Sequence, residues 1–407
     1  MSVRSDPPAR LRAMLAPAIL PAYASSAARV LRRRVLGARR FPGDGPAIWR
    51  SVVDACWTGA YLAASAGHFR QFWTRDLAFS SRAMVSLGFS DRLEASLAWA
   101  LDAWARTGRV TTTIFGGRRA ADVFAPGCDS LPLLLRALEA GACERLVDRH
   151  GHWLGREVER YAREVIDPRT WLVRADRRFS SHRDTVPSGS NCYANTMLAV
   201  MDGVLRRTGW FASPVAQSAG ERLVDHFWQG DHFSDQPDAD IATGDANVFP
   251  FWLGAVPDSL GLDRALAALD GAGLTRPLPL RYAFRRNRHA EDPVQRLFVP
   301  DYQGTSIWSS LGAIYLQIQA RVDPGAARAG LAAYARLSER DGTLREVYTE
   351  TLEPYRGRLG IFLADEGMLW AAILLETDLV LGNPAASGTR TLPGNGAGVP
   401  HRAPLPV

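Results

Sequence analysis

Long apolar runs are missing from this sequence of 407 residues. No uninterrupted apolar stretch approaches the ~18 residues that a bilayer-spanning helix needs, so we expect no transmembrane segment. Cysteine is scarce too, and no two of the four cysteines have C-x-x-C spacing: Cys56, Cys128, Cys143 and Cys192. Such scattered cysteines indicate buried thiols rather than a disulfide framework or a metal cage.

Signatures of several common enzyme classes are also absent. The sequence contains no G-x-S-x-G, no P-loop, no Rossmann glycine fingerprint and no H-E-x-x-H. His150 and His152 are separated by one glycine, which is too short a pattern to indicate a metal. These absences leave paired carboxylates as the plausible catalytic machinery, and we expect no metal and no other cofactor.

The central part of the chain lacks an excess of positive charge. The net charge is +6, but residues 1–40 carry nine arginines and one acid and so contribute +8. The remainder is 6 − 8 = −2, which is close to neutral. A nucleic-acid partner would require a basic face on the folded domain, so we expect none.

Composition divides the chain into three parts. Residues 1–44 form a basic leader rich in Arg and Ala, which we expect to be partly disordered. An apolar run at residues 13–24 has the shape of a weak export signal, but prolines interrupt it, so we expect a cytoplasmic protein with export left open. Residues 45–382 have the pattern of a folded domain, and the Gly-, Pro-, Ala- and Thr-rich residues 383–407 predict a disordered tail.

Helical periodicity begins near Ile48 and continues to the end of the central domain. It predicts twelve helices, at about 46–64, 74–88, 90–107, 129–141, 143–166, 188–208, 214–228, 247–256, 258–271, 304–322, 324–340 and 361–381. Strand-like segments are short and lie between helices, at 110–114, 171–174 and 280–284. An even number of helices without βαβ alternation predicts an all-α fold of helical hairpins closed into a ring.

Five loops are longer than a tight turn requires: 109–128, 167–187, 229–246, 272–303 and 341–360. Loops of this length in a compact domain usually carry function. The residues with chemical potential lie in these loops or beside them, so we expect the functional site there.

Trp73, Arg75 and Asp76 form the first candidate site, where a helical pattern begins. A sugar offers an apolar ring face for stacking and hydroxyls that need both donors and acceptors, and these three side chains supply all of these. The alternative is a capped helix start, in which Thr74 or Asp76 accepts from free N–H groups and an ion pair opens the helix.

Two acidic residues are candidates for proton transfer. Asp184 lies in a loop, where a carboxyl above a cavity is desolvated and holds its proton near neutral pH; the alternative is a solvated turn. Glu346 lies beside an aromatic residue, Tyr348, and four residues before Glu350, so the alternative is an acidic surface run.

Further polar and aromatic candidates begin other helices. Asn191 follows the Asp184 loop, and Gln303 and Trp308 open the tenth predicted helix. The alternative for these two is a capped helix with a core Trp. Asp129 precedes the fourth predicted helix, where capping alone explains it.

The sequence resembles the glucoamylases and their relatives with a six-hairpin barrel, among them amylo-α-1,6-glucosidases, trehalases and neutral invertases. Residues 73–76 resemble the W-[TP]-R-D element of these enzymes. Five further similarities follow in family order, at 129–133, 167–184, 244–250, 302–308 and 346–348. The resemblance implies an (α/α)6 toroid with short β-segments in its loops.

By this resemblance the chain is a glycoside hydrolase, inverting and exo-acting, on α-glucosidic or related linkages of small saccharides. Asp184 would be the general acid, with a raised pKa, and Glu346 the general base, with an ordinary pKa. The resemblance also implies an oligosaccharide or glycoside as partner, bound by seven side chains: Trp73, Arg75, Asp76, Asn191, Gln303, Trp308 and Tyr348.

The sequence departs from the family pattern around the acid, where His182 and Arg183 replace the Trp that commonly precedes it. Val347 also stands in place of the usual Gln. Two other functions on the same barrel therefore stay open. One is a sugar epimerase or lyase that uses His68 or His182 as a base, and the other is a sugar-binding protein without catalysis.

Overall fold

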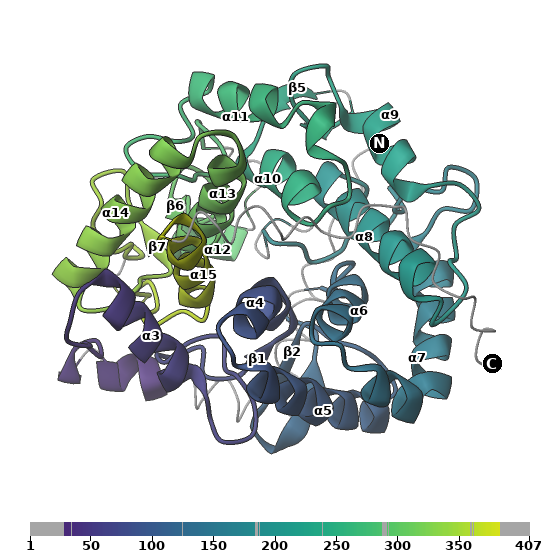
Figure 1. Ribbon diagram of the computed structural model, residues 1–407, viewed down its shortest axis with the longest axis horizontal. Coiled ribbons are helices and arrows are strands. Elements are labelled where there is room, and N and C mark those ends of the chain that lie inside the picture. Colours follow the sequence, from purple (N-terminus) through teal and green to yellow (C-terminus); the bar gives the residue numbers. More distant parts are fainter. Residues whose placement is uncertain are drawn as a thin grey trace.

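The computed structural model describes residues 28–33, 35–123, 125–183, 186, 188–237, 239–286, 291, 293–358, 360 and 362–382. Within these ranges, twelve helices form two concentric rings (Figure 1). The outer ring contains α3 (Gly45–Cys56), α5 (Ser90–Thr107), α7 (Glu144–Val165), α9 (Ala219–Phe227), α11 (Leu262–Gly271) and α14 (Pro324–Asp341). The inner ring contains α4 (Thr74–Ser86), α6 (Ser130–Ala140), α8 (Cys192–Thr208), α10 (Gly244–Trp252), α13 (Ser309–Val322) and α15 (Ala371–Gly382).

Outer and inner helices alternate along the chain, so the twelve helices make six hairpins. Each inner helix packs against the next one, and α15 packs against α4, which closes the ring. The predicted all-α (α/α)6 barrel is therefore confirmed.

The two rings differ in how their helices are buried. Every residue of α10 is buried, which matches a helix enclosed by the ring. On outer helix α7 the buried residues recur at helical spacing, as in Leu146, Leu154 and Val158, and charged residues occupy the opposite face. These two patterns are why the sequence indicated the helices correctly.

Helix ends follow local chemistry. In α14 the side chain of Asp323 accepts a hydrogen bond from the N–H of Ala326 at 2.9 Å, and Gly342 ends the helix with φ of 64°. Gly108 and Gly209 end α5 and α8 in the same left-handed conformation. Caps of this kind explain why most predicted boundaries fall close to the observed ones.

Seven predicted boundaries differ by four or more residues. Helices α9, α11 and α13 begin at 219, 262 and 309 rather than at 214, 258 and 304, and α10 ends at 252 rather than at 256. The first predicted helix extends to 64, but α3 ends at Cys56, after which Thr58 accepts a hydrogen bond from the N–H of Tyr61 and forms a turn. Helix α8 begins at Cys192 rather than at 188, because Asn191 caps it. The last predicted helix begins at 361, but α15 begins at Ala371, and the described residues before it form an extended loop.

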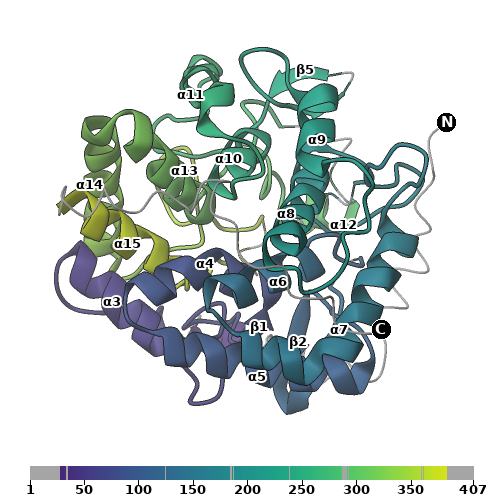
Figure 2. The same cartoon turned by 45° about the vertical axis from the view of Figure 1, so that its right-hand side comes forward.

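The strands lie in the loops that lead to inner helices. An antiparallel sheet joins β1 (Phe72–Trp73), β2 (Thr113–Phe115) and β3 (Arg119–Ala121), and two pairs join β4 (Ser234–Gln236) to β5 (Ala239–Ala242) and β6 (Ile307–Trp308) to β7 (Val347–Tyr348). Figures 1 and 2 both place β1 and β2 beside α4, α5 and α6. Short helical segments η1 (Gly116–Arg118), η2 (Asp258–Leu260) and α12 (Pro293–Phe298) complete the connections.

The predicted strand-like segments are realised unequally. The segment 110–114 overlaps β2, whereas 171–174 and 280–284 contribute isolated bridges, from Val173 to Ile166 and from Arg281 to Ile307. All four cysteines are buried and free, as the sequence indicated. No helix among the described residues is long and apolar enough to cross a membrane.

The described chain begins inside the predicted leader. Residues 28–33 and 35–36 are helical, and Phe41 donates its N–H to the carbonyl of Gly342 at 2.7 Å. Residues 1–27 of the leader and the whole predicted tail, 383–407, lie outside the described residues. The predicted segment boundaries at 44 and 383 therefore stay predictions.

Close packing between α13 and α14 gives a test of the barrel wall. A Cβ at Gly312 would overlap the hydroxyl of Tyr334 and lie 2.5 Å from the carbonyl oxygen of Pro279. We expect Gly312→Ala to lower the free energy of unfolding by about 1–3 kcal/mol, because an overpacked core must shift its neighbours. The measurement is chemical denaturation followed by circular dichroism.

Gly271, the last residue of α11, is the matched control, because a Cβ there meets nothing within 4 Å. We expect Gly271→Ala to leave the free energy of unfolding unchanged or to raise it slightly. Equal stability of the two variants would mean that α13 and α14 do not pack as described.

Candidate active site

The candidate site residues gather where inner helices begin. Trp73 directly precedes α4, Asn191 precedes α8 and Trp308 precedes α13. Because outer and inner helices alternate in direction, all loops that lead from an outer to an inner helix lie on one face of the barrel. These loops are the long ones that the sequence singled out.

Arg75 joins two hairpins through a buried ion pair. Its Nε and Nη2 atoms contact both carboxylate oxygens of Asp129, and Nη2 also donates to the hydroxyl of Ser180 at 3.0 Å. Asp129 is fully buried and accepts a further hydrogen bond from the hydroxyl of Tyr193 at 2.8 Å. The side chain of Asp129 makes no capping hydrogen bond to α6, so capping alone does not explain Asp129. The alternative for residues 73–76 included an ion pair, and Arg75 forms one, but with a carboxylate of another hairpin.

Two other residues of the 73–76 segment lie at the same helix start. Asp76 is buried in the first turn of α4. Trp73 is half-buried, with its ring edge to face with Phe69, and its indole N–H has no hydrogen-bond partner among the described residues. This indole N–H is therefore a buried donor whose hydrogen-bonding capacity is not used by the described residues.

Trp370 has a related position that the sequence analysis missed. It directly precedes α15, it is 5% exposed, and its indole N–H also has no partner among the described residues. Its ring centroid lies 6.3 Å from that of Trp308. Tryptophans thus precede α4, α13 and α15, and this repeated position is the signal that could have revealed Trp370.

Asp184 lies outside the described residues, so its distance from Glu346 stays a prediction. The chain that leads to it is held firmly. The carbonyl of His182 accepts hydrogen bonds from the amide of Gln303 and from the hydroxyl of Tyr282, both at 3.2 Å. Gln303 therefore binds the backbone of its neighbouring loop at His182.

The guanidinium of Arg183 is held in an ion pair with Asp245. Its Nε donates to Asp245 Oδ2 at 2.8 Å, its Nη2 contacts Asp245 Oδ1 at 2.5 Å, and Asp235 lies 3.4 Å away. Burial and the neighbouring Asp245 charge raise the pKa of Asp235, and Arg183 opposes this. The positive charge beside position 184 is therefore balanced by two carboxylates.

His182 is a buried, neutral imidazole in an aromatic cage. Burial, with the charges of Arg75 and Arg183, lowers its pKa well below the usual value. Its Nδ1 contacts the hydroxyl of Tyr282, and its Nε2 lies 3.5 Å from the hydroxyl of Ser310. These contacts give His182 a structural position at the centre of the barrel.

Asn191, Trp308 and Tyr348 have neighbours within the protein. Asn191 accepts from the N–H of Ala194 as the cap of α8, and Trp308 donates its indole N–H to the carbonyl of Tyr302 at 2.7 Å. Tyr348 belongs to β7, pairs with Ile307 of β6 and is fully buried. Sugar contacts by these three residues stay predictions.

Glu346 lies at the end of the loop before β7 and is 4% exposed. The hydroxyl of Tyr302 donates to its carboxylate, and the N–H of Asp365 donates to its Oε2 at 3.2 Å. Burial raises the pKa of Glu346 to about 7, the negative Asp365 adds to this, and Tyr302 and His68 oppose it. The expected ordinary pKa of Glu346 is therefore wrong, because the sequence did not show that this carboxyl is desolvated. The surface-run alternative for Glu346 is wrong for the same reason.

Asp365 is the ionised neighbour of Glu346. It is fully buried, and its carboxylate accepts from the Ser65 hydroxyl at 2.5 Å and from the N–H groups of His68 and Phe69 at 2.9 and 2.8 Å. Burial alone would raise the pKa of Asp365, but His68, Arg33 and Ser65 outweigh it and hold the pKa well below its usual range. Asp365 is thus a permanent negative charge beside Glu346.

His68 is committed to this cluster. Its Nδ1 lies 2.9 Å from Asp365 Oδ1, and the same nitrogen contacts Arg33. The cluster of Glu346, Asp365 and His68 does not form a metal site, and no group of three or more His, Cys, Asp or Glu side chains in the described part of the chain is arranged to hold one.

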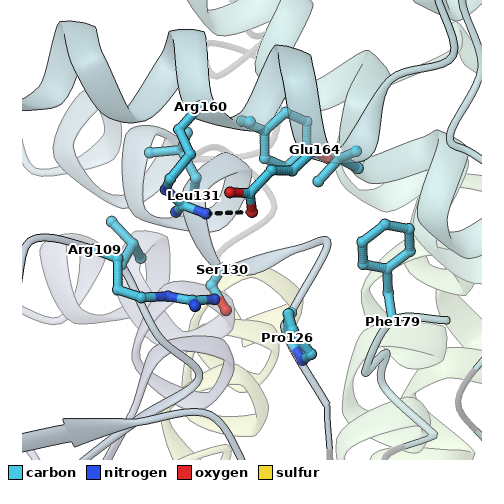
Figure 3. Close-up of a pocket in the computed structure, with 11 residues that line it drawn as sticks. Arg109, Pro126, Ser130, Leu131, Arg160, Glu164 and Phe179 are labelled. Atoms are coloured by element: carbon cyan, nitrogen blue, oxygen red, sulfur yellow. Dashed lines mark hydrogen bonds and ion pairs between the residues drawn. The ribbon is translucent and has the colours of Figure 1, made fainter. Parts of the chain in front are cut away.

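A separate pocket lies between α7 and the start of α6 (Figure 3). Arg160 and Glu164 of α7 form an ion pair over it, and Arg109 and Ser130 line its opposite side. None of the predicted sugar-site residues lines this pocket. We therefore assign it no part in the candidate active site.

The Arg75–Asp129 pair makes a stability prediction. We expect Arg75→Ala to lower the free energy of unfolding by about 3–5 kcal/mol, because it leaves the buried Asp129 carboxylate without its cation. Arg82, also on α4, is the control: its side chain is 43% exposed and lies 3.8 Å from Glu376. Arg82→Ala should cost about 1 kcal/mol or less. Equal losses in chemical denaturation would contradict the pairing.

Comparison with known proteins shows a likeness of structure. No protein-family model matches the chain, and no curated protein sequence matches it. A glycosidase variant in complex with glucose superposes with a TM-score of 0.58 and 16% identity, over 83% of this chain and 97% of that chain. The GH63 mannosylglycerate hydrolase from Thermus thermophilus, in complex with Tris and D-glycerate, superposes with a TM-score of 0.55 and 13% identity, over 82% and 100%.

A rhamnosidase from Klebsiella oxytoca with rhamnose bound superposes with a TM-score of 0.53 and 13% identity, over 83% of this chain and 65% of that chain. Identities this low establish architecture rather than activity. This chain therefore has the six-hairpin (α/α)6 barrel fold that these glycosidases share.

Proposed function

We propose that this protein is a glycoside hydrolase, inverting and exo-acting, on α-glucosidic or related linkages of small saccharides. The observation that carries the proposal is Glu346: a buried carboxyl with a pKa of about 7, on the barrel face where tryptophans precede the inner helices. A general base works best when its pKa lies near the working pH. Structural neighbours with bound glucose, rhamnose or D-glycerate support a sugar as the substrate class.

In this mechanism two carboxyls act on opposite sides of the scissile bond. Asp184 protonates the leaving oxygen, and Glu346 removes a proton from the water that attacks the anomeric carbon. The oxocarbenium-like transition state needs both events, and inversion requires the two carboxyls to stand ~6.5–9.5 Å apart so that the water fits between them. The carbonyl of His182, two residues before Asp184 in the sequence, accepts hydrogen bonds from Gln303 and Tyr282.

The contacts of the histidines argue against the epimerase or lyase alternative. His182 is buried among aromatic rings with both ring nitrogens near hydroxyls, and His68 is held between Asp365 and Arg33. A base that abstracts a proton from a sugar carbon must reach the substrate.

The test is a panel of α-glucosides and related small glycosides, with the product anomers followed by NMR. We expect hydrolysis of at least one member with inverted configuration. Glu346→Gln and Asp184→Asn should each lower turnover by about 10²- to 10⁴-fold and leave sugar binding nearly intact, because both groups act mainly in the transition state. Glu350→Gln is the control, because Glu350 is 58% exposed and pairs with Arg281. Retained configuration, or full activity of either active-site variant, would refute the assignment, and binding without turnover would indicate a non-catalytic sugar-binding barrel.

The raised pKa of Glu346 predicts where the acidic limb of the pH profile lies. The base works as the carboxylate, so kcat/KM should rise with pH through about 7 rather than through the ordinary range near 4.5. The same shift makes Glu346 favour its protonated form in the folded state. Glu346→Gln should therefore raise the melting temperature relative to the parent above pH 7, where the parent buries a charge, and not below pH 4. An acidic limb near pH 4.5 would contradict the desolvated position.

A further inference from the structure

The N-terminal helix places an arginine against the acidic cluster of the barrel. Residues 28–33 and 35–36 are helical, and Arg33 belongs to this segment. Its guanidinium lies with Nη1 3.1 Å from Asp365 Oδ1, contacts Glu366 through Nη2, and donates to the carbonyl of Ala364 at 3.2 Å. The Arg33 side chain is only 10% exposed, so most of its length is covered by the barrel.

A second arginine binds from the same side of this helix. Arg29 lies four residues earlier, which places it on the same helical face as Arg33. It donates from Nε to the carbonyl of His68 at 2.9 Å. Arg32, adjacent in sequence, lies on another face and is exposed. The helix is thus docked by one face, through two arginines that reach the same loop region.

Asp365 connects this docked helix to Glu346. The N–H of Asp365 donates to Glu346 Oε2 at 3.2 Å, and the N–H of Glu346 donates to the carbonyl of Asp365 at 3.0 Å. The main chain of Asp365 therefore binds both the side-chain carboxylate and the main-chain N–H of Glu346. Any group that fixes Asp365 also fixes the carboxylate of Glu346.

We propose that Arg33 is a positioning residue of the active site: from the N-terminal helix it fixes Asp365, and through Asp365 it orients the Glu346 carboxylate toward the attacking water. This inference rests on the proposed role of Glu346 as the general base. It makes a segment of the basic leader part of the catalytic apparatus. Arg33 neutralises two carboxylates, Asp365 and Glu366, that would otherwise repel the ionised base.

The charged and polar groups that face Glu346 decide whether loss of Arg33 raises or lowers the pKa of Glu346. Tyr302 donates to it, His68 and Asp365 act on it electrostatically, and Arg33 acts on it from the docked helix. Glu366, the residue after Asp365, forms an ion pair with Arg33 and a second one with Arg345, whose Nη1 lies 3.5 Å from Oε2. Without the positive charge of Arg33, the negative charges of Asp365 and Glu366 act on Glu346 with less compensation. They raise the pKa of Glu346, because a nearby negative charge disfavours the ionised carboxylate.

The experiment compares Arg33→Gln, Arg33→Lys and Arg32→Gln in the full-length chain. In Arg33→Gln we expect the acidic limb of kcat/KM to move up by about 1 pH unit, as a Coulomb interaction over several ångströms at the effective dielectric constant of a protein interior implies. At a pH below this limb, kcat should fall about tenfold with little change in KM. Arg33→Lys should restore part of the shift because it keeps the charge, and Arg32→Gln should match the parent.

A second measurement is independent of activity. The 13C chemical shift of the Glu346 carboxyl, assigned by its absence in Glu346→Gln, gives the titration midpoint of this group directly. We expect the midpoint to rise in Arg33→Gln and to stay at the parental value in Arg32→Gln. If the parent hydrolyses no glycoside, the proposed function fails, and this titration alone decides whether Arg33 acts on Glu346.

If the parent is active but neither the midpoint nor the acidic limb moves in Arg33→Gln, the inference is overturned and the proposed function stands. An equal shift in Arg32→Gln would also overturn it, because the effect would then belong to the net charge of the helix. If Arg33→Gln does not fold, Arg33→Lys is compared with the parent instead. A rise of the midpoint and of the acidic limb in Arg33→Lys, smaller than about 1 pH unit, supports the inference, and values equal to the parent's overturn it.

Discussion

Buried carboxylates need positively charged partners, and this requirement organises the barrel face on which the inner helices begin. Asp129 is bound by Arg75, Asp245 by Arg183 and Asp365 by Arg33, in each case from a distant part of the chain. An uncompensated charge in such positions would cost several kcal/mol. Each pair therefore fastens one loop or helix to another, and together they hold the face on which the inner helices begin.

Glu346 differs from these carboxylates because its carboxyl is held by neutral donors, the hydroxyl of Tyr302 and the N–H of Asp365. Its pKa rises to about 7, whereas that of Asp365 falls. Two acids in direct contact thus have opposite protonation behaviour. Environments that separate the proton affinities of neighbouring acids are typical of catalytic sites, since one group can then exchange a proton while the other stays charged.

The docked N-terminal helix extends the same principle to the leader. The excess of arginine in residues 1–40 predicted a leader that is either solvated or docked on the surface. In the structure Arg29 and Arg33 contact the barrel, and Arg33 meets the carboxylates next to Glu346. The charge of this segment is complementary to the acidic cluster that the loops present. Residues 28–33 therefore contact the surroundings of Glu346, which the composition of the leader did not indicate.

The sequence by itself indicated the barrel, because helical periodicity is a local pattern that survives in the fold, and an even number of helices without βαβ alternation favours helical hairpins. It also indicated Glu346, and it placed Trp73, Arg75 and Trp308 at helix starts. It could not indicate that Arg75 binds Asp129, that Asp365 and Arg33 surround Glu346, or that residues before Ala371 form a loop instead of a helix. Those facts depend on contacts between residues as much as 332 positions apart, such as 33 and 365. Burial and ion pairing set the proton affinity of a carboxyl, and only the tertiary structure decides both.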